Sequence, residues 1–410
     1  MTTASSGVRD KLFAIEAYLN TKHIDRAEVI HMLVLALISM KHVLLLGPPG
    51  NDKSRLLRHL FDALIGARVF KTQLDKTSGL DMLMGSIDIE ARMRNVVRYE
   101  TKNMLPEATH ALIEEVNEAS GWTKKGMLDI LSEPSVYKNE GVEHLSDLQV
   151  VVGSTNNWHD QKTEAAFGDR FPIRMVLGYL NTPEAYRMLL ELPDNGVASP
   201  DAPTVTLEEL AIAQDEVKNI PFSPDAADVF VRVRERFHDE DIVVSDRRWY
   251  QSRAVWRAEA WMRDGLEVEP DDLLAGKHTL WVDPDLDHRL KVASILEELC
   301  SIDNERAQEI ERAVVDAWDD RPTELALLNE QVVKTRSALK DVSRLRKRSS
   351  IVTSATMTIE DMLKRFETEV EIGDEREQRR VEAEQLETAR TDQIQTMRTR
   401  ANADARRRRS

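Results

Sequence analysis

Eight residues from Gly47 to Ser54, Gly-Pro-Pro-Gly-Asn-Asp-Lys-Ser, have the residue types and spacing of a phosphate-binding loop. The segment follows the apolar run 42–46 and precedes the amphipathic stretch 55–61, which predicts a strand, a loop and a helix in that order. In this arrangement, main-chain N–H groups and the N-terminus of the helix face a bound anion. We expect Lys53 to reach the β- and γ-phosphates of a nucleotide and the hydroxyl of Ser54 to bind Mg²⁺.

One residue of this loop departs from the usual pattern. Asp52 stands where glycine is expected before the lysine. A carboxylate beside a triphosphate weakens binding unless it turns outward. The alternative interpretation of the segment is a plain Pro-Gly turn before a helix. The predicted nucleotide-binding residues of the loop are Gly47, Pro48, Pro49, Gly50, Asn51, Asp52, Lys53 and Ser54.

A second chemical signal is the short apolar run 110–113, which ends in the two carboxylates Glu114 and Glu115. At the end of a strand next to a phosphate loop, the first acid holds Mg²⁺ and the second polarises the attacking water. Glu114 is longer by one methylene than the aspartate usual there. A strand that simply ends at the solvent is the alternative.

A third strand end carries an amide. The run 148–153 is apolar apart from Gln149 and is followed by Ser154, Thr155 and Asn156. We expect Asn156 to hold the attacking water and the γ-phosphate, with the adjacent Asn157 leaving this assignment open. The alternative is a turn that ends the strand.

The elements that position these residues are predicted from short apolar runs separated by helical stretches. The runs are Val43–Leu46, Arg68–Leu74, Ala111–Ile113, Leu148–Val152 and Arg174–Tyr179, of which Arg68–Leu74 is the most mixed. Runs of this kind are typical of buried strands in a parallel sheet covered by helices. We therefore predict an α/β nucleotide-binding domain over residues 1–185.

The rest of the chain is predicted to be helical. Thr182-Pro183-Glu184 and Ser245-Asp246 have the pattern of helix starts in a domain over residues 186–285. Over residues 286–410, Leu325, Leu328, Val332, Leu339 and Val342 fit a heptad pattern with Thr335 in one slot. Thr358 and Asp361 resemble a capping box that opens a second helix, with an apolar stripe of Ile359, Leu363, Phe366 and Val370. Two interpretations stay open, a helical hairpin with a charged end and a coiled-coil arm that binds a partner.

Composition limits the classes of function. The 410 residues include 72 acidic and 56 basic side chains, and the net charge of -16 argues against a general nucleic-acid binder. The single cysteine, Cys300, allows no intrachain disulfide and no Cys-rich metal site. The longest apolar run, Val29 to Met40, is too short to span a bilayer. We expect a soluble, cytoplasmic protein with no membrane contact.

The order of these motifs resembles the MoxR group of AAA+ ATPases over residues 25 to 285. Besides the phosphate loop, the acidic pair and Ser-Thr-Asn, the matching motifs are Leu105 to Ala108 (Leu-Pro-Glu-Ala), Asp169 to Phe171 (Asp-Arg-Phe) and Ser245 to Trp249 (Ser-Asp-Arg-Arg-Trp). The last motif looks most like the RavA branch. The resemblance implies a P-loop AAA+ core with a parallel sheet, then an α-helical lid, with long C-terminal helices or a coiled coil added.

The resemblance also implies roles for single residues. Gly50, Lys53 and Ser54 would bind phosphate and metal, and Glu114, Glu115 and Asn156 would take the metal, water-activating and first-sensor roles. Arg170 would be the finger that reaches the nucleotide of a neighbouring subunit, with Arg174 as the second candidate. Arg247 would be the second sensor, with Arg248 as the fallback. Such proteins form rings, usually hexamers, and the segment from Tyr137 to Asp147 resembles a hairpin that often faces the ring pore.

Three functions are compatible with this resemblance. The leading one is a ring-forming motor or chaperone that uses ATP to remodel a protein client, with a von Willebrand factor A-type partner as in many MoxR proteins. The second is a nucleotide-binding scaffold with weak turnover, because Asp52 and Glu114 both depart from the usual residues. The third is a nucleic-acid motor that uses the basic residues Arg406 to Arg409, against which the net charge counts.

Overall fold

The structure is a computed structural model that describes residues 3–96, 99–132, 135–138, 141–144, 148–156, 165–191, 202–322, 324–345 and 350–407. The chain divides into two compact units, Met1–Cys300 and Ser301–Ser410. The first unit contains one large apolar core, and the second contains two small ones. The predicted domain boundaries after residues 185 and 285 stay a prediction.

A five-stranded parallel sheet lies in the first unit, with the strand order β3-β4-β7-β1-β8. This confirms the predicted α/β fold, and the strands lie within three residues of the predicted bounds. The mixed pattern of β3 is explained by its place at the edge of the sheet. The strands are β1 Val43–Leu46, β3 Val69–Gln73, β4 His110–Glu114, β7 Val150–Thr155 and β8 Ile173–Val176.

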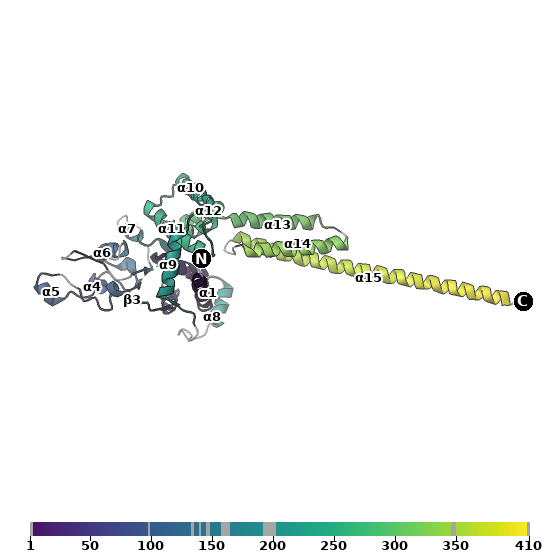
Figure 1. The fold of residues 1–410 in the computed structure, drawn as a ribbon, viewed down its shortest axis with the longest axis horizontal. Helices are drawn as coiled ribbons and strands as arrows, with labels where there is room; N and C mark the ends of the chain where they lie inside the picture. Colours follow the sequence, from purple (N-terminus) through teal and green to yellow (C-terminus); the bar gives the residue numbers. More distant parts are fainter. Residues whose placement is uncertain are drawn as a thin grey trace. The chain divides into compact units, whose positions relative to one another are not determined.

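Helices surround this sheet (Figure 1). The apolar run of the sequence is α2, whose residues from Val29 to Ser39 are all buried, so its hydrophobicity serves the core. No helix in the described part of the chain is long and apolar enough to cross a membrane. The other elements of this region are α1 Thr3–Lys22, α2 Ala27–Ser39, α3 Lys53–Asp62, β2 Leu64–Ile65, α4 Asp81–Met84, α5 Ile89–Met93, η1 Leu105–Glu107, η2 Val116–Glu118, α6 Gly121–Ser132 and α7 Ala165–Gly168.

A helical region follows the sheet within the same unit. Its two predicted helix starts are confirmed, because Thr182 Oγ1 accepts from the N–H of Ala185 and Ser245 Oγ accepts from the N–H of Arg248. Three tryptophans, Trp256, Trp261 and Trp281, are fully buried in its core. The elements are α8 Pro183–Glu191, β9 Val205–Thr206, α9 Leu207–Asn219, α10 Pro224–Asp239, α11 Asp246–Met262, η3 Pro270–His278 and α12 Leu286–Cys300.

The predicted hairpin before β7 is present. Strands β5, Ser135–Lys138, and β6, Gly141–His144, pair in antiparallel register. The hairpin begins two residues before the predicted segment from Tyr137 to Asp147, and β6 ends at His144. Residues 145–147 lie outside the described residues.

The described part of the second unit contains the two predicted helices, within α14 Leu325–Arg344 and α15 Ser350–Arg407, and in addition α13 Ile302–Asp319. Figure 1 shows them side by side, with α15 continuing beyond the other two. Phe366 of α15 packs against Leu328 and Val332 of α14 and against Trp318 of α13. The two predicted apolar stripes therefore meet, and α13 supplies a third.

The capping box predicted at Thr358 is wrong. Thr358 lies inside α15, and its hydroxyl donates to the carbonyl of Ser354 one turn earlier. The helix also continues through Gly373 without a break. A Cβ at Gly373 would lie 2.8 Å from Leu325 Cδ1, so the glycine allows the start of α14 to approach α15 closely. It marks a packing contact and not a helix end.

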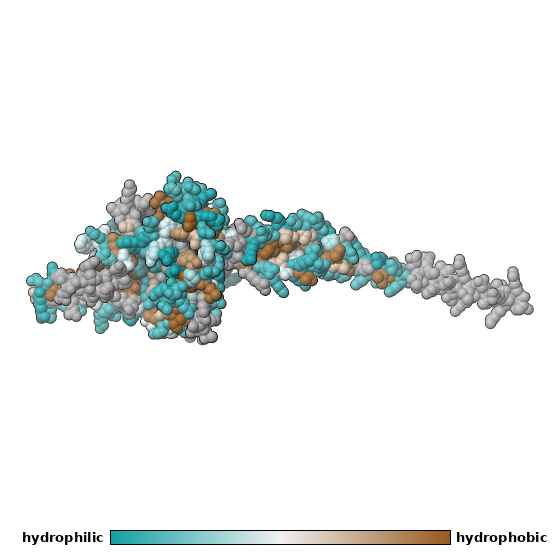
Figure 2. Space-filling view, turned by 45° about the horizontal axis from the view of Figure 1, so that its top comes forward, coloured by the Kyte–Doolittle hydropathy of each residue, from teal (hydrophilic) through white to brown (hydrophobic). Residues whose placement is uncertain are grey.

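On the face shown in Figure 2, the described surface is mostly hydrophilic, and apolar residues form small separate patches. This fits the high content of charged residues, 31%.

Candidate nucleotide-binding site

The predicted phosphate loop connects β1 to α3 and is bent by three residues with positive φ. These are Gly47, Gly50 and Asp52, at +153°, +77° and +73°. A Cβ at Gly47 would lie 2.1 Å from the carbonyl oxygen of Leu177, so only glycine fits where the loop passes the end of β8. The first amides of α3 have no intrahelical partner and are available to an anion at the bend.

Lys53 lies at the centre of the loop and is only 8% exposed. Its ammonium donates to the carbonyls of Gly47 at 2.6 Å and Pro48 at 2.9 Å, and to Asn51 Oδ1 at 2.9 Å. Burial lowers the pKa of this ammonium, and the carboxylates of Glu115 and Glu114 oppose that shift. The group is therefore held inside the loop and close to two acids.

The two predicted metal ligands are in contact. Ser54, in the first turn of α3, donates its hydroxyl to Glu114 Oε1 at the end of β4. The longer glutamate thus reaches the serine from its own strand. A hydroxyl and a carboxylate are oxygen ligands of the kind that Mg²⁺ takes, together with phosphate and water.

The water-activating acid and the predicted sensor also meet. Glu115 has a φ of +53°, an uncommon backbone conformation for a residue with a side chain. Its carboxylate accepts from Asn156 Nδ2 at 2.5 Å, and Asn156 Oδ1 accepts from Lys53 Nζ at 3.4 Å. Since β1, β4 and β7 are parallel and adjacent, their carboxyl ends bring Lys53, Ser54, Glu114, Glu115 and Asn156 together.

The carboxylate of Asp52 is bound by two neighbouring side chains. It lies 2.5 Å from His23 Nδ1, and it pairs with Arg55, with 2.7 Å between Oδ1 and Nε. Burial raises the pKa of Asp52, but the hydrogen bonds and charges of His23 and Arg55 outweigh this effect and bring the pKa below its ordinary value. Asp52 is therefore an anion that is already neutralised by Arg55.

Three residues that support the loop were missed in the sequence. Arg26 Nη2 donates to the carbonyls of Gly178, at 2.9 Å, and Asn51, at 3.3 Å. The hydroxyl of Tyr179 donates to the carbonyl of Pro49 at 3.0 Å. His23 is the third. None lies in a recognisable motif, and only the fold brings them to the loop.

The arginines of the two later motifs, Arg170 and Arg247, differ from this cluster in exposure and contacts. Arg247 is exposed, and Arg170 is partly buried with one hydrogen bond, from Nη1 to the carbonyl of Ala166. Burial lowers the pKa of Arg170, and the nearby charge of Arg247 adds to the shift. Among the described residues no hydrogen bond joins either arginine to Lys53 or Glu115.

The fallback candidates are internal. Arg248 is fully buried and binds Asp169 Oδ1 at 3.2 Å and the carbonyl of Thr279 at 2.9 Å. Burial lowers the pKa of Arg248 to about 10, against the opposing charge of Asp169. Arg174 is also buried and stacks on Trp281, 5.6 Å from the ring centre. Both connect the sheet to the helical region, so we keep Arg170 and Arg247 as the proposed nucleotide contacts.

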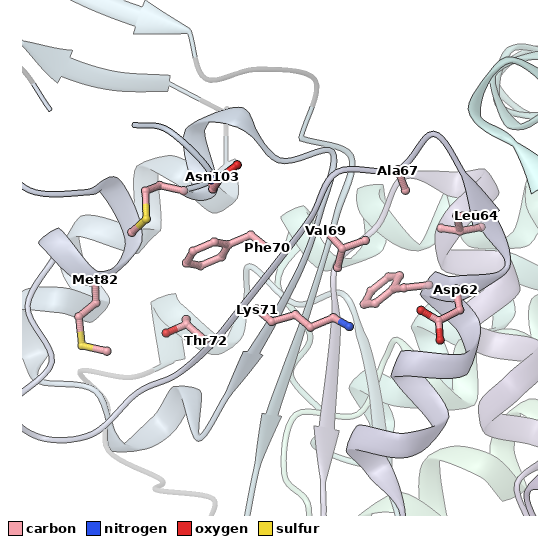
Figure 3. A pocket seen from close by; sticks show the side chains of 11 residues that line it. Asp62, Leu64, Ala67, Val69, Phe70, Lys71, Thr72, Met82 and Asn103 are labelled. Atoms are coloured by element: carbon pink, nitrogen blue, oxygen red, sulfur yellow. The ribbon is translucent and has the colours of Figure 1, made fainter. Parts of the chain in front are cut away.

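A pocket of about 760 Å³ lies elsewhere, along the edge strand β3. Figure 3 shows its lining side chains on both sides of that strand, with Phe70 and Met82 on one side and Val69 and Asp62 on the other. None of the predicted nucleotide-binding residues lines it. The pocket therefore does not belong to the candidate site.

The sheet and the loop–helix site define a P-loop ATPase of the AAA+ type. The family model for the MoxR domain in the MoxR-vWA-beta-propeller ternary systems matches residues 10–220, which is 211 of the 410 residues. The chain belongs to this family of MoxR AAA+ ATPases. A second model, for an AAA lid domain, matches residues 225–296. The predicted RavA-like branch stays a prediction.

Two proteins of Methanocaldococcus jannaschii, each named as an uncharacterized protein, are similar to this chain in sequence. MJ0079 of Methanocaldococcus jannaschii is 26% identical, over 71% of this chain and 75% of the relative. MJ0812 of the same organism is 25% identical, over 68% and 73%. The crystal structure of a candidate ATPase from Cytophaga hutchinsonii superposes with a TM-score of 0.58 at 16% identity, covering 72% of this chain and 96% of that one. The last match supports the fold alone.

Proposed function

We propose that this protein binds ATP with Mg²⁺ at the β1–α3 loop, hydrolyses it, and uses the cycle to remodel a partner protein or complex. The observation that carries the proposal is the meeting of Lys53, Ser54, Glu114, Glu115 and Asn156 at the carboxyl ends of three adjacent parallel strands. A cluster that served only to form structural ion pairs would not need an amide, two acids, a hydroxyl and a buried lysine around an anion-binding bend.

The side chains present fit the nucleotide and the metal. In the proposal, Lys53 and the amides of the loop bind the phosphates, and Ser54 and Glu114 hold Mg²⁺, which supplies charge neutralisation to the phosphoryl group. Glu115 orients and deprotonates the attacking water, since its carboxylate is held by Asn156 beside the loop. Asn156 thus positions the base and contacts Lys53.

The contacts of Asp52 and Glu114, the two residues that depart from the usual pattern, favour ATP hydrolysis over the scaffold alternative. Asp52 is directed to His23 and Arg55, so its charge is compensated. Glu114 reaches Ser54 in spite of its different length. Neither departure removes a group that hydrolysis needs.

The proposed assembly is a homo-oligomeric ring, a hexamer, with nucleotide between subunits. Arg170 and Arg247 support it, because they lie near one another and, among the described residues, make no hydrogen bond to the phosphate cluster of their own chain. An arginine supplied by a neighbour stabilises the charge on the transferring phosphoryl group. In the ring, Arg170 of one subunit would reach the nucleotide of the next, and Arg247 would be the second sensor.

The proposed partner is a protein with a von Willebrand factor A domain. The description of the matching family model, which places its members in MoxR-vWA-beta-propeller ternary systems, supports this choice. From the same description, we propose a β-propeller protein as the third component of the complex. Nucleic acid is not proposed as a partner, given the net charge of -16.

The test is phosphate release with ATP and Mg²⁺, measured for the wild type and Glu115→Gln, together with the mass of the assembly. We expect Glu115→Gln to bind ATP and assemble as the wild type does, with hydrolysis reduced by about 100-fold or more. Equal background rates in both proteins would favour the scaffold. Salt-sensitive DNA binding that disappears when residues 406–409 are removed would instead support the nucleic-acid motor.

A further inference from the structure

The carboxylate in the phosphate loop is part of a buried chain of side chains that the proposed function does not use. His23, just after α1, contacts Asp52 through Nδ1 at 2.5 Å and His59 of α3 through Nε2, with 2.9 Å to His59 Nδ1. The side chain of His23 is fully buried, and His59 is only 7% exposed. The residue after α1 thus contacts both the start and the middle of α3.

The donors in this chain follow from the charge of Asp52. An ionised carboxylate only accepts, so His23 Nδ1 carries the hydrogen and donates it. Burial lowers the pKa of His23, which keeps the ring neutral, and Nε2 is then an acceptor. His59 therefore donates to His23, and His23 donates to Asp52.

Asp52 needs such support because of its backbone. Its φ of +73° and ψ of 11° lie in the left-handed region, which glycine adopts freely and other residues adopt at a cost. Asp52 is also the residue before α3, so its conformation sets the direction of Lys53 and of the first amides of the helix. A side chain that fixes Asp52 thereby fixes the groups that grip phosphate.

We propose that His23, supported by His59, is a positioning residue of the nucleotide site, which acts by holding the Asp52 carboxylate away from the phosphates and the loop in its binding conformation. The inference rests on the proposed nucleotide site. His23 touches no nucleotide in this account. In the usual form of the loop, glycine adopts the positive φ freely. Here the hydrogen bond from His23 stabilises Asp52 in that conformation.

The proposal predicts that His23 matters only while Asp52 is present. The affinity for Mg²⁺-ATP is measured on the full chain for the wild type, His23→Ala, Asp52→Gly and the double variant. His23→Ala is expected to weaken binding about tenfold, and by less than twofold in the Asp52→Gly background. The resulting coupling of about five- to tenfold corresponds to about 1.0 to 1.4 kcal/mol. Asp52→Gly alone is expected to bind at least as tightly as the wild type.

Two further variants separate positioning from general stability. His23→Asn retains a donor in place of Nδ1–H and is expected to restore most of the affinity, which also provides a variant if His23→Ala folds poorly. His31 is a matched control, because it is a buried histidine of the same unit held between Glu16 and Glu259. His31→Ala is expected to change ATP affinity by the same factor with and without Asp52.

Equal losses of affinity for His23→Ala in both backgrounds, with no recovery in His23→Asn, would overturn the inference and leave the nucleotide site intact. A wild type and an Asp52→Gly variant that both lack affinity for ATP would overturn the proposed function, and this inference with it.

Discussion

The phosphate loop and the arginine motifs of the same unit are built differently. Around the loop the polar side chains pair with each other, as Lys53 does with Asn156 and Ser54 with Glu114. Arg170 and Arg247 instead make no hydrogen bond to that cluster within the described residues, and Arg247 is exposed. One chain thus brings together the residues proposed for the phosphate, metal and water-activating roles, and no hydrogen bond among the described residues joins its two arginines to them.

From this difference we expect one chain to be sufficient for ATP binding, whereas hydrolysis also needs a second chain. A single chain contains the groups proposed for gripping ATP. The proposed contact of Arg170 requires a second copy, so the account predicts that affinity survives a change at Arg170 that abolishes turnover.

The largest expected effect comes from Arg170→Ala. Removing an arginine that stabilises the transferring phosphoryl group is expected to lower ATP hydrolysis by about 1,000-fold, or about 4 kcal/mol, with ATP affinity of the isolated chain unchanged. Steady-state phosphate release and equilibrium binding measure the two quantities. Arg234→Ala, at an exposed position of α10, is the matched control and should leave both unchanged.

Mixing provides the sharper form of this experiment. Subunits with Arg170→Ala are combined with subunits with Glu115→Gln, each inactive alone. Some mixed interfaces then contain an intact acid from one subunit and an intact arginine from the other, so partial activity should return. No recovery in mixed assemblies of confirmed composition would contradict an arginine supplied by a neighbour.

The next largest effect distinguishes the role of Arg248 from that of the adjacent Arg247. Arg248→Ala removes a buried guanidinium and leaves Asp169 and several carbonyls without their donor. The expected loss is about 3 kcal/mol of unfolding free energy, measured by denaturant titration. Arg247→Ala should change that free energy by less than about 0.5 kcal/mol, because its side chain is exposed. Similar losses for both would show that the two roles are assigned wrongly.

A smaller effect is expected from His110, a buried residue that belongs neither to the phosphate loop nor to the arginine motifs. His110 is fully buried at the start of β4, and burial lowers its pKa to about 4. The unfolded chain, with an ordinary histidine pKa near 6.5, binds a proton first as the pH falls. The contribution of the neutral His110 ring to the free energy of unfolding is therefore fully present above about pH 6.5, and it is lost as the pH falls towards 4.

Between pH 7 and pH 5, the cost assigned to His110 is about 2 kcal/mol of unfolding free energy. His110→Leu should lose less stability than the wild type over this interval, by about that amount. The exposed His238 provides the control, since His238→Leu should retain the pH dependence of the wild type. The same dependence in His110→Leu and in the wild type would contradict a neutral buried ring.

Much of the fold and the centre of the candidate site could be predicted from the sequence, because both depend on local patterns. Apolar runs indicated all five strands of the sheet. The Lys-Ser pair, the two glutamates and the asparagine each follow such a run, and parallel strands place their ends together.

What could not be predicted depends on contacts between distant residues. The direction of the Asp52 carboxylate is set by His23, 29 residues earlier, which no motif marks. The choice between Arg247 and Arg248 depends on Asp169 and on the carbonyl of Thr279. In the second unit, Thr358 looked like a cap because its neighbours fit the pattern, but packing against α13 and α14 continues the helix in both directions.

The most direct test of the central claim is the binding of ATP in the presence of Mg²⁺ by the wild type and by Lys53→Ala, measured by calorimetry on protein shown to be folded. The account predicts saturable binding by the wild type and a loss of at least about 100-fold in Lys53→Ala, because the buried ammonium lies at the centre of the loop. A wild type without affinity for ATP, or a Lys53→Ala variant that binds equally well, would contradict it.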